Sequence, residues 1–297
     1  MKKVFSVLAV LLFAALLLTH PDTMANGVRE GISLCTQTVV PSLFPFFVVT
    51  SLLLSLGVDS DLQGLCGPMM QPLFQMRGVC ALPLLAGLLG GYPTGARTAA
   101  QLHGRGVITR QEAELLLGFC NNCGPGFLIG YVGVGILGSM RAGVCLFLIH
   151  TVAALLTGVL LCRMYRRREV PLLSRDLPAQ TVSVSGAVTT SVASALNATL
   201  NICAYVVLFR AAAALISGVV PDVLLGGLEM VSGTAAVSSD VSGFVTAAGI
   251  VAWGGLSVHC QTLSVAENLS LRFHMLGKIL QTILSIILAF GAAQMLY

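Results

Sequence analysis

Charged side chains are scarce in this sequence. Asp, Glu, Lys and Arg make up only 9% of its 297 residues, whereas a soluble domain carries roughly 25%. Hydrophobic residues account for 56%, and the mean hydropathy is +0.91. This balance excludes an ordinary soluble domain and predicts an all-α integral membrane protein. At ~20 residues per span the length suits about eight to ten membrane segments.

Recognisable reaction chemistry is also missing. The chain has no serine–histidine–aspartate set, HExxH pattern or nucleotide-binding loop, so we expect no enzyme and no catalytic residue. The net charge of +4 predicts no nucleic-acid partner, because the basic residues flank apolar runs. Of the nine cysteines, Cys120 and Cys123 form a CxxC spacing, but no second pair, acidic cluster or histidine cluster accompanies it. We therefore expect no metal and no cofactor.

Two apolar stretches are interrupted where a membrane helix should be continuous. Residues 84–100 contain Gly90, Gly91, Pro93 and Gly95, and residues 225–239 contain a Ser-Gly-Thr break. Glycine loosens a helix, and proline removes a hydrogen-bond donor. Broken backbone at membrane depth persists only where protein or a water-filled cavity satisfies it. Paired breaks of this kind mark substrate sites in transporters.

The rest of the chain suggests two similar halves. We assign 1–31 to a signal-anchor-like helix and link, with its cleavage left open, and 32–165 to a first repeat. Residues 166–192 are a predicted cytosolic linker, and 193–297 a second repeat. Each repeat combines a span, a hairpin, a broken span and a long span. The predicted hairpins are residues 78–103 and 222–241.

Further helix breaks, a helix-start signal and basic clusters support this order of elements. Asn121 and Asn122 break the span that follows the first hairpin, and Gly254-Gly255 break its counterpart in the second half. Thr109 with Glu112 has the spacing of a capping box, which predicts a helix start there. Basic clusters near residues 2–3, 77–110 and 163–168 place the amino end, the first hairpin's ends and the linker inside. The number of membrane crossings between these cytosolic sites then predicts inverted-topology repeats, as in many secondary transporters.

The runs PFFVVTSLL, GGYPTGARTAAQL, TRQEAELLLGF and CNNCGPGF resemble the YlbJ-type sporulation integral membrane proteins of the nucleoside-recognition (Gate) group. The resemblance extends from about residue 32 to the end. It implies a fold similar to concentrative nucleoside transporters, with re-entrant helical hairpins. It also implies transport of dipicolinic acid across the outer forespore membrane. Members often carry Lys just after the first break, where this chain keeps the positive charge as Arg97. Its CNNC variant is atypical.

The candidate substrate-binding residues lie at these breaks or carry charge close to them. They are Tyr92, Pro93, Thr94, Gly95, Arg97, Asn121, Asn122, Arg210, Glu229, Ser232, Gly233 and Thr234. Each also has a structural alternative. Arg97 can extend to the cytosolic face, Arg210 can pair internally with Glu229 or Asp240, and the asparagines can cap broken helices. We expect the two hairpin tips, 92–95 and 232–234, to meet near mid-membrane.

Three function classes remain open. The first is a carrier for a small organic anion such as dipicolinate, or for a nucleoside-like or other small metabolite. The second is a non-transporting scaffold for sporulation, and the third, weakest reading is a membrane enzyme. The expected partners are the bilayer and a small anionic substrate, and homo-oligomerisation is left open. For a dianion we expect Arg97 or Arg210 to face the cavity, because arginine suits planar carboxylates.

Overall fold

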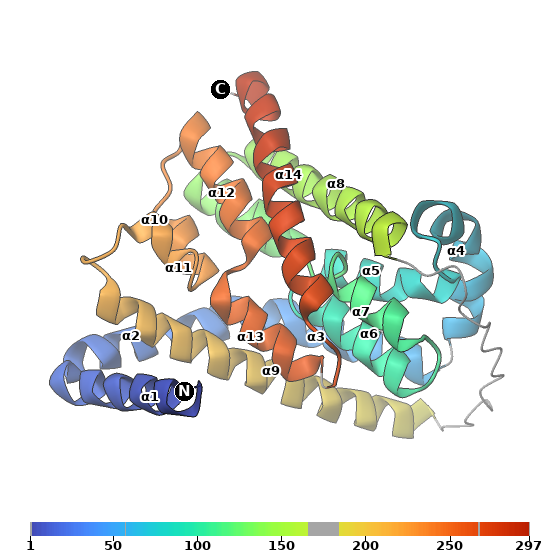
Figure 1. The fold of residues 1–297 in the computed structure, drawn as a ribbon, viewed down its shortest axis with the longest axis horizontal. Helices are drawn as coiled ribbons and strands as arrows, with labels where there is room; N and C mark the ends of the chain where they lie inside the picture. Colours follow the sequence, from blue (N-terminus) through green and yellow to red (C-terminus); the bar gives the residue numbers. More distant parts are fainter. Residues whose placement is uncertain (1, 57, 166–183, 267, 297) are drawn as a thin grey trace.

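The computed structural model describes residues 2–56, 58–165, 184–266 and 268–296, and within these ranges the chain forms helices and no β-strand (Figure 1). The α-helices are α1 (Lys2–Thr19), α2 (Pro21–Leu34), α3 (Val40–Ser55), α4 (Val58–Phe74), α5 (Ala81–Gly90), α6 (Thr94–Gly104), α7 (Arg110–Leu117), α8 (Met140–Tyr165), α9 (Val184–Ile216), α10 (Asp222–Leu225), α11 (Met230–Ala235), α12 (Val241–Trp253), α13 (Gly255–Val265) and α14 (Arg272–Leu296). Three further elements depart from the α geometry: π-helical η1 (Cys35–Val39), 3-10 helical η2 (Gly78–Cys80) and π-helical η3 (Gly126–Ile136).

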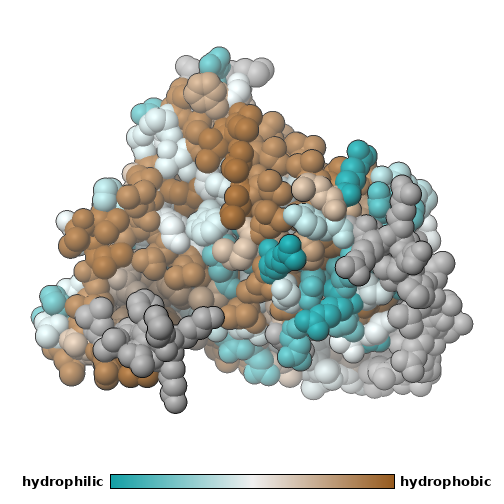
Figure 2. Space-filling model, in the orientation of Figure 1, coloured by the Kyte–Doolittle hydropathy of each residue, from teal (hydrophilic) through white to brown (hydrophobic). Residues whose placement is uncertain are grey.

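Four described helices are long and apolar enough to cross a membrane. They are Met140–Tyr165, Ser185–Ile216, Val241–Val265 and Arg272–Gln294. The helices 64–74 and 78–90, which meet at a bend of 83°, give a fifth span if the pair is counted as one. Figure 2 shows hydrophobic residues predominating over the upper part of α14, interrupted by paler residues toward α12, with hydrophilic residues gathered toward α6 and α7. An all-α membrane protein is thus confirmed. The described spans number fewer than eight to ten, because several apolar segments are short or broken.

The first predicted break is a helical hairpin. Helices α5 and α6 pack against each other and are joined by residues 91–93, where Gly91 has a φ of +81°. That backbone conformation suits glycine, which has no Cβ to clash. The capping box is also present: the Thr109 hydroxyl accepts from the Glu112 N–H, and the Glu112 carboxylate accepts from the Thr109 N–H. The prediction for 78–103 therefore locates the helix–turn–helix correctly.

The second hairpin differs from its prediction. Its turn lies at residues 226–229, between the short helices α10 and α11. Ser232, Gly233 and Thr234 lie inside α11, so placing the break at them was wrong. The physical reason is Glu229, whose carboxylate accepts hydrogen bonds from the N–H groups of Val231 and Ser232 and caps the helix. This capping starts a helix where the Ser-Gly-Thr sequence indicated an interruption.

Helical structure begins inside the segment that was predicted as the linker, and the predicted broken spans are present. Helix α9 begins at Val184, so residues 184–192 are helical rather than linker, and residues 166–183 lie outside the described part. Gly254 and Gly255, with φ of +85° and +78°, separate α12 from α13 as predicted. Residues 118–125 likewise separate α7 from η3. These breaks bring non-helical backbone into the interior of the protein.

Glycines allow the first broken span to pass through the interior. A Cβ added at Gly87 or Gly95 would lie 1.7 or 1.9 Å from the Cys120 carbonyl oxygen, so residues 118–124 run directly against the α5–α6 hairpin. On the other side, a Cβ at Gly277 of α14 would lie 1.9 Å from the Gly118 carbonyl oxygen. Helix α14 also packs on α8 and α12. The interior break is thus held between the first hairpin and the last helix.

Candidate functional site

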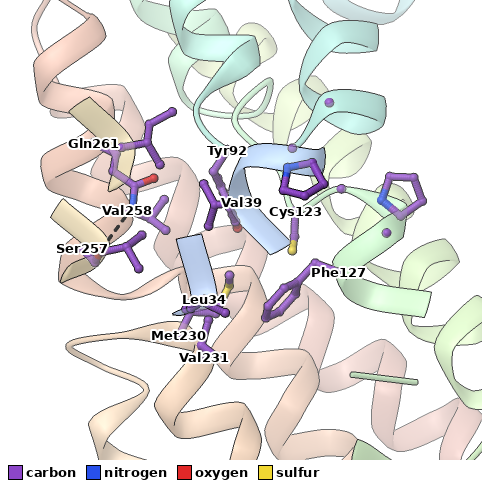
Figure 3. Close-up of a pocket in the computed structure, with 18 of the residues that line it drawn as sticks. Leu34, Val39, Tyr92, Cys123, Phe127, Met230, Val231, Ser257, Val258 and Gln261 are labelled. Atoms are coloured by element: carbon purple, nitrogen blue, oxygen red, sulfur yellow. Dashed lines mark hydrogen bonds between the residues drawn. The ribbon is translucent and has the colours of Figure 1, made fainter. Parts of the chain in front are cut away.

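A cavity of about 290 Å³ lies where the backbone breaks of the two halves meet (Figure 3). This volume is close to the lower end of the range for small-molecule sites, roughly 300–1,000 Å³. Its walls come from α2, η1, α3, the first hairpin turn, the start of η3, α9, the second hairpin and α13. The lining residues are Leu34, Val39, Pro41, Pro45, Leu89, Gly90, Gly91, Tyr92, Cys123, Gly124, Pro125, Gly126, Phe127, Ile202, Val206, Glu229, Met230, Val231, Ser257, Val258 and Gln261.

The lining is mostly apolar, with a few polar groups from the second half. Gln261 donates a 3.1 Å hydrogen bond to the Ser257 hydroxyl on α13, drawn as a dashed line in Figure 3. Across the cavity, the Tyr92 and Phe127 rings provide flat aromatic surface from the first half. An apolar site with a small number of placed polar groups is typical of ligand pockets. The shape and lining therefore suit a small, largely planar molecule.

Glu229 is the charged residue among those that line the cavity. Its side chain is almost fully buried. One oxygen accepts from the Val231 N–H at 2.9 Å, and the other accepts from the Ser232 N–H and hydroxyl, each at 2.8 Å. A buried carboxylate needs such compensation, because desolvation disfavours the charge. Glu229 thus both caps α11 and forms part of the cavity wall.

Arg210 on α9 completes the compensation of Glu229 from outside the cavity. Its guanidinium nitrogen Nη1 lies 3.8 Å from the Glu229 carboxylate and donates to the Ser232 hydroxyl. Nη2 lies 3.0 Å from the carboxylate of the exposed Glu30. Arg210 is therefore shared between two acids. The pairing of Arg210 with Glu229, one of the two alternatives from the sequence, is present. Asp240, the other alternative, instead accepts a hydrogen bond from the Gly243 N–H and caps α12.

Behind the cavity wall lies a buried polar cluster. Lys278 of α14 is fully buried and its ammonium donates to the Asn121 carbonyl at 2.6 Å, to Gln281 Oε1 at 2.9 Å and to the Tyr92 hydroxyl at 3.4 Å. Gln281 Nε2 in turn donates to the Asn122 side chain at 2.9 Å. We define this set, Tyr92, Asn121, Asn122, Lys278 and Gln281, as the Lys278 cluster.

The sequence-predicted candidates fall into separate groups. Tyr92 and Glu229 line the cavity, and Asn121 and Asn122 belong to the cluster behind it. The Arg97 guanidinium donates to the Ser194 hydroxyl of α9 and stacks over the Phe47 ring at 5.2 Å, away from the cavity lining. The remaining candidates are also absent from the cavity lining: Pro93, Thr94, Gly95, Arg210, Ser232, Gly233 and Thr234. Neither Arg97 nor Arg210 is therefore among the residues that line this cavity.

The hairpin tips approach one another through Tyr92 of the expected first tip, but not through the expected residues 232–234 of the second. Tyr92 and the segment 229–231 line the same cavity, whereas Ser232 points to Arg210 and Glu229. Within the described residues no group of three or more His, Cys, Asp or Glu side chains is arranged for a metal ion. Cys120 and Cys123 are both buried and unbridged.

Lys278 and Gln281 are the residues that the sequence analysis missed. The last apolar run was treated as an uninterrupted span, although it contains a lysine with a glutamine three positions later. Ionisable side chains inside spans are rare and usually face a protein interior or a cavity. Side chains three residues apart share one helix face. A lysine followed three positions later by a glutamine within an apolar run was the sequence signal that could have identified them.

Comparison with known proteins connects this chain to a family. The sequence pattern of the family described as nucleoside recognition (Gate) matches residues 36–213, more than half of the chain. The sporulation integral membrane protein YlbJ of Bacillus subtilis (strain 168) is 34% identical over 165 residues. That alignment covers 56% of this chain and 40% of YlbJ, so the chain matches less than half of its relative's length. No solved structure matches the chain.

Proposed function

We propose that this chain, which belongs to the nucleoside recognition (Gate) family, carries a small planar organic molecule across a membrane through the cavity between its two halves. The family match and the relative support a YlbJ-type, sporulation-associated and transporter-like character for it. The substrate, its charge and the membrane concerned belong to the proposal. The same holds for the inverted arrangement of the two repeats.

One observation carries the proposal: a single cavity is lined by the backbone breaks of both halves. Gly91 and Gly124 lie at the two breaks of the first half, and Glu229 and Ser257 adjoin those of the second. Interrupted helices of secondary transporters leave backbone groups for substrate at the interface between repeats. A membrane scaffold has no need of interior breaks that converge on a cavity. The arrangement therefore favours a carrier over a scaffold.

We propose dipicolinate, moved across the outer forespore membrane, as the first substrate to test. Gly126 and Phe127 line the cavity at the beginning of η3, where a helix presents unpaired N–H groups and the positive end of its dipole. Carboxylates bind favourably at such ends. The Tyr92 and Phe127 rings can contact a pyridine ring, and the Glu229 charge is already compensated by Arg210.

A neutral, nucleoside-like substrate is the second candidate. The observation that favours it is the acidic charge of Glu229 in the wall, together with the description of the family. A dianion brought near an acid must overcome repulsion, whereas a neutral heterocycle does not. The two candidates therefore differ in how uptake should respond to substrate charge.

The test is uptake into liposomes containing the purified protein. Radiolabelled dipicolinate and a radiolabelled nucleoside are supplied separately, and protein-free liposomes provide the background. Saturable dipicolinate uptake that unlabelled dipicolinate inhibits and the nucleoside does not would support the anion carrier. The reverse pattern would support the second candidate. Uptake of neither compound, with the protein inserted and folded, would contradict the proposed carrier for both substrates and favour the scaffold.

A further inference from the structure

The Lys278 ammonium lies deep in the protein, where dipoles surround it and, among the described residues, no acid pairs with it. It is fully buried, and its hydrogen-bond acceptors are the Asn121 carbonyl, Gln281 Oε1 and the Tyr92 hydroxyl. Among the described residues, no Asp or Glu carboxylate pairs with it within 4.0 Å. A buried cation usually has an anionic partner, because dipoles alone replace its hydration incompletely.

The arginines near the breaks differ from Lys278 in their pairing or in their position. Among the described residues no acid pairs with Arg97 either, but its guanidinium contacts Ser194 and Phe47. Arg210 lies close to both Glu30 and Glu229, and Arg97 lies over Phe47 outside the cavity lining. Elsewhere, Arg77 pairs with Glu112 at 2.6 Å. Among the described residues, Lys278 is therefore the buried cation without a protein acid that also contacts a residue of the cavity wall, Tyr92.

The position of Lys278 connects it to the cavity through one residue. Its ammonium lies 4.8 Å from the centre of the Tyr92 ring, and Tyr92 is also part of the cavity wall. Asn121, whose carbonyl accepts from Lys278, precedes the wall residues Cys123 and Gly124. A ligand in the cavity is thus separated from the ammonium by about one side chain. In the low-dielectric interior of a protein, charges at such separations interact much more strongly than they do in water.

A polar atom of the cluster also retains unused hydrogen-bonding capacity. Asn121 donates through Nδ2 to the Thr262 hydroxyl at 2.7 Å, but its buried Oδ1 has no partner. An unpaired buried oxygen is unfavourable, so the cluster is not self-sufficient as a purely structural network. Ionisable side chains in membrane interiors are rare, and they usually face a cavity and mark substrate or ion pathways. The unpaired oxygen of Asn121 and the lack of an acid partner for Lys278 among the described residues together indicate that Lys278 has a role besides stabilising the fold.

We infer that Lys278 is the specificity-determining positive charge of the cavity, which selects a carboxylate-bearing substrate through the Tyr92 wall. This deepens the proposed function and rests on the cavity being the substrate site. The ammonium attracts the anion without contacting it directly, and Tyr92 separates the two. The acid Glu229 on the opposite half remains neutralised by Arg210. Selectivity for an anion thus comes from α14 rather than from the arginines near the breaks.

The experiment measures equilibrium binding to the purified full chain in detergent. The probes are dipicolinate and its neutral analogue of the same shape, pyridine-2,6-dicarboxamide. Lys278→Gln removes the charge, Lys278→Arg retains it, and Ser285→Ala is the matched control. Ser285 is buried on the same helix, and its hydroxyl has no partner. Circular dichroism and gel filtration establish that each variant is folded, and Lys278→Met replaces any glutamine variant that is not.

The expected result is a change in selectivity rather than a general loss of binding. The neutral variant should weaken dipicolinate binding by about tenfold or more while changing dicarboxamide binding by less than about threefold. Lys278→Arg should preserve most of the preference, and Ser285→Ala all of it. An unchanged ratio in the folded neutral variant, or a wild type with no preference for the dianion, overturns the inference. Wild-type preference without liposome uptake would instead contradict transport and leave Lys278 as the anion determinant.

Discussion

The hydroxyl of Tyr92 donates a 2.6 Å hydrogen bond to the carbonyl oxygen of Val251, 159 residues further along the chain. Tyr92 lies in the turn of the first hairpin, and Val251 lies in the last turn of α12, just before the break at Gly254. The bond therefore joins a break of one half to a break of the other. Both residues are buried, so the bond is sheltered from competing water and its loss leaves a polar group unsatisfied.

Tyr92→Phe should destabilise the protein while keeping the cavity wall aromatic. The substitution removes the bond to Val251 and an acceptor of the Lys278 ammonium. We expect the free energy of unfolding to fall by roughly 1–3 kcal/mol, the cost of an unsatisfied buried group. Reversible unfolding in detergent measures it. Tyr131→Phe is the control, since its ring stacks on Phe127 without a comparable bond between the halves. Equal losses in both variants would contradict a linking role for Tyr92.

The Arg210–Glu229 pair should show energetic coupling that the Arg210–Glu30 pair lacks. Glu229 is 4% exposed at its side chain, whereas Glu30 is 59% exposed. Removing Arg210 leaves a buried charge uncompensated in the first case and a solvated one in the second. A double-mutant cycle with Arg210→Gln and Glu229→Gln should give a coupling energy of roughly 0.5–3 kcal/mol. The parallel cycle with Glu30→Gln should lie near zero, and a larger value there would reverse this assignment.

The sequence predicted the breaks well and the contacts between them poorly. Gly91, Gly254 and the Thr109–Glu112 capping box act through local backbone conformation, which residue type largely determines. Glu229 was identified as a charge, but its capping of α11 moved the second turn away from Ser232. The Arg97 contacts with Phe47 and Ser194 join three helices far apart in sequence. Such tertiary contacts have no local signature, and the same is true of the cluster around Lys278.

Gly95→Ala should disrupt the packing of the first hairpin. The new Cβ would lie 1.9 Å from the Cys120 carbonyl oxygen, which is backbone and cannot move aside without shifting the interior break. We expect a loss of at least about 1–3 kcal/mol, the usual cost of overpacking. Gly104→Ala on the same helix is the matched control, because its Cβ would meet nothing within 4 Å. Thermal unfolding of both variants in detergent provides the measurement. A destabilised Gly104 variant beside an unaffected Gly95 variant would refute the close-packing argument.

The proposed inverted arrangement of the two halves predicts that their hairpins open to opposite sides of the membrane. Arg105 follows the first hairpin and is exposed, and Val219, which is 83% exposed, precedes the second. Single cysteines at these positions should react with a membrane-impermeant thiol reagent from opposite faces of sealed, oriented vesicles. The arginines near the first hairpin predict that position 105 is cytosolic. The wild-type protein corrects for its own nine cysteines, and permeabilised vesicles establish that each new cysteine is reactive. Labelling of both positions from the same face would exclude the inverted repeat, because two hairpins of opposite orientation cannot begin on one side.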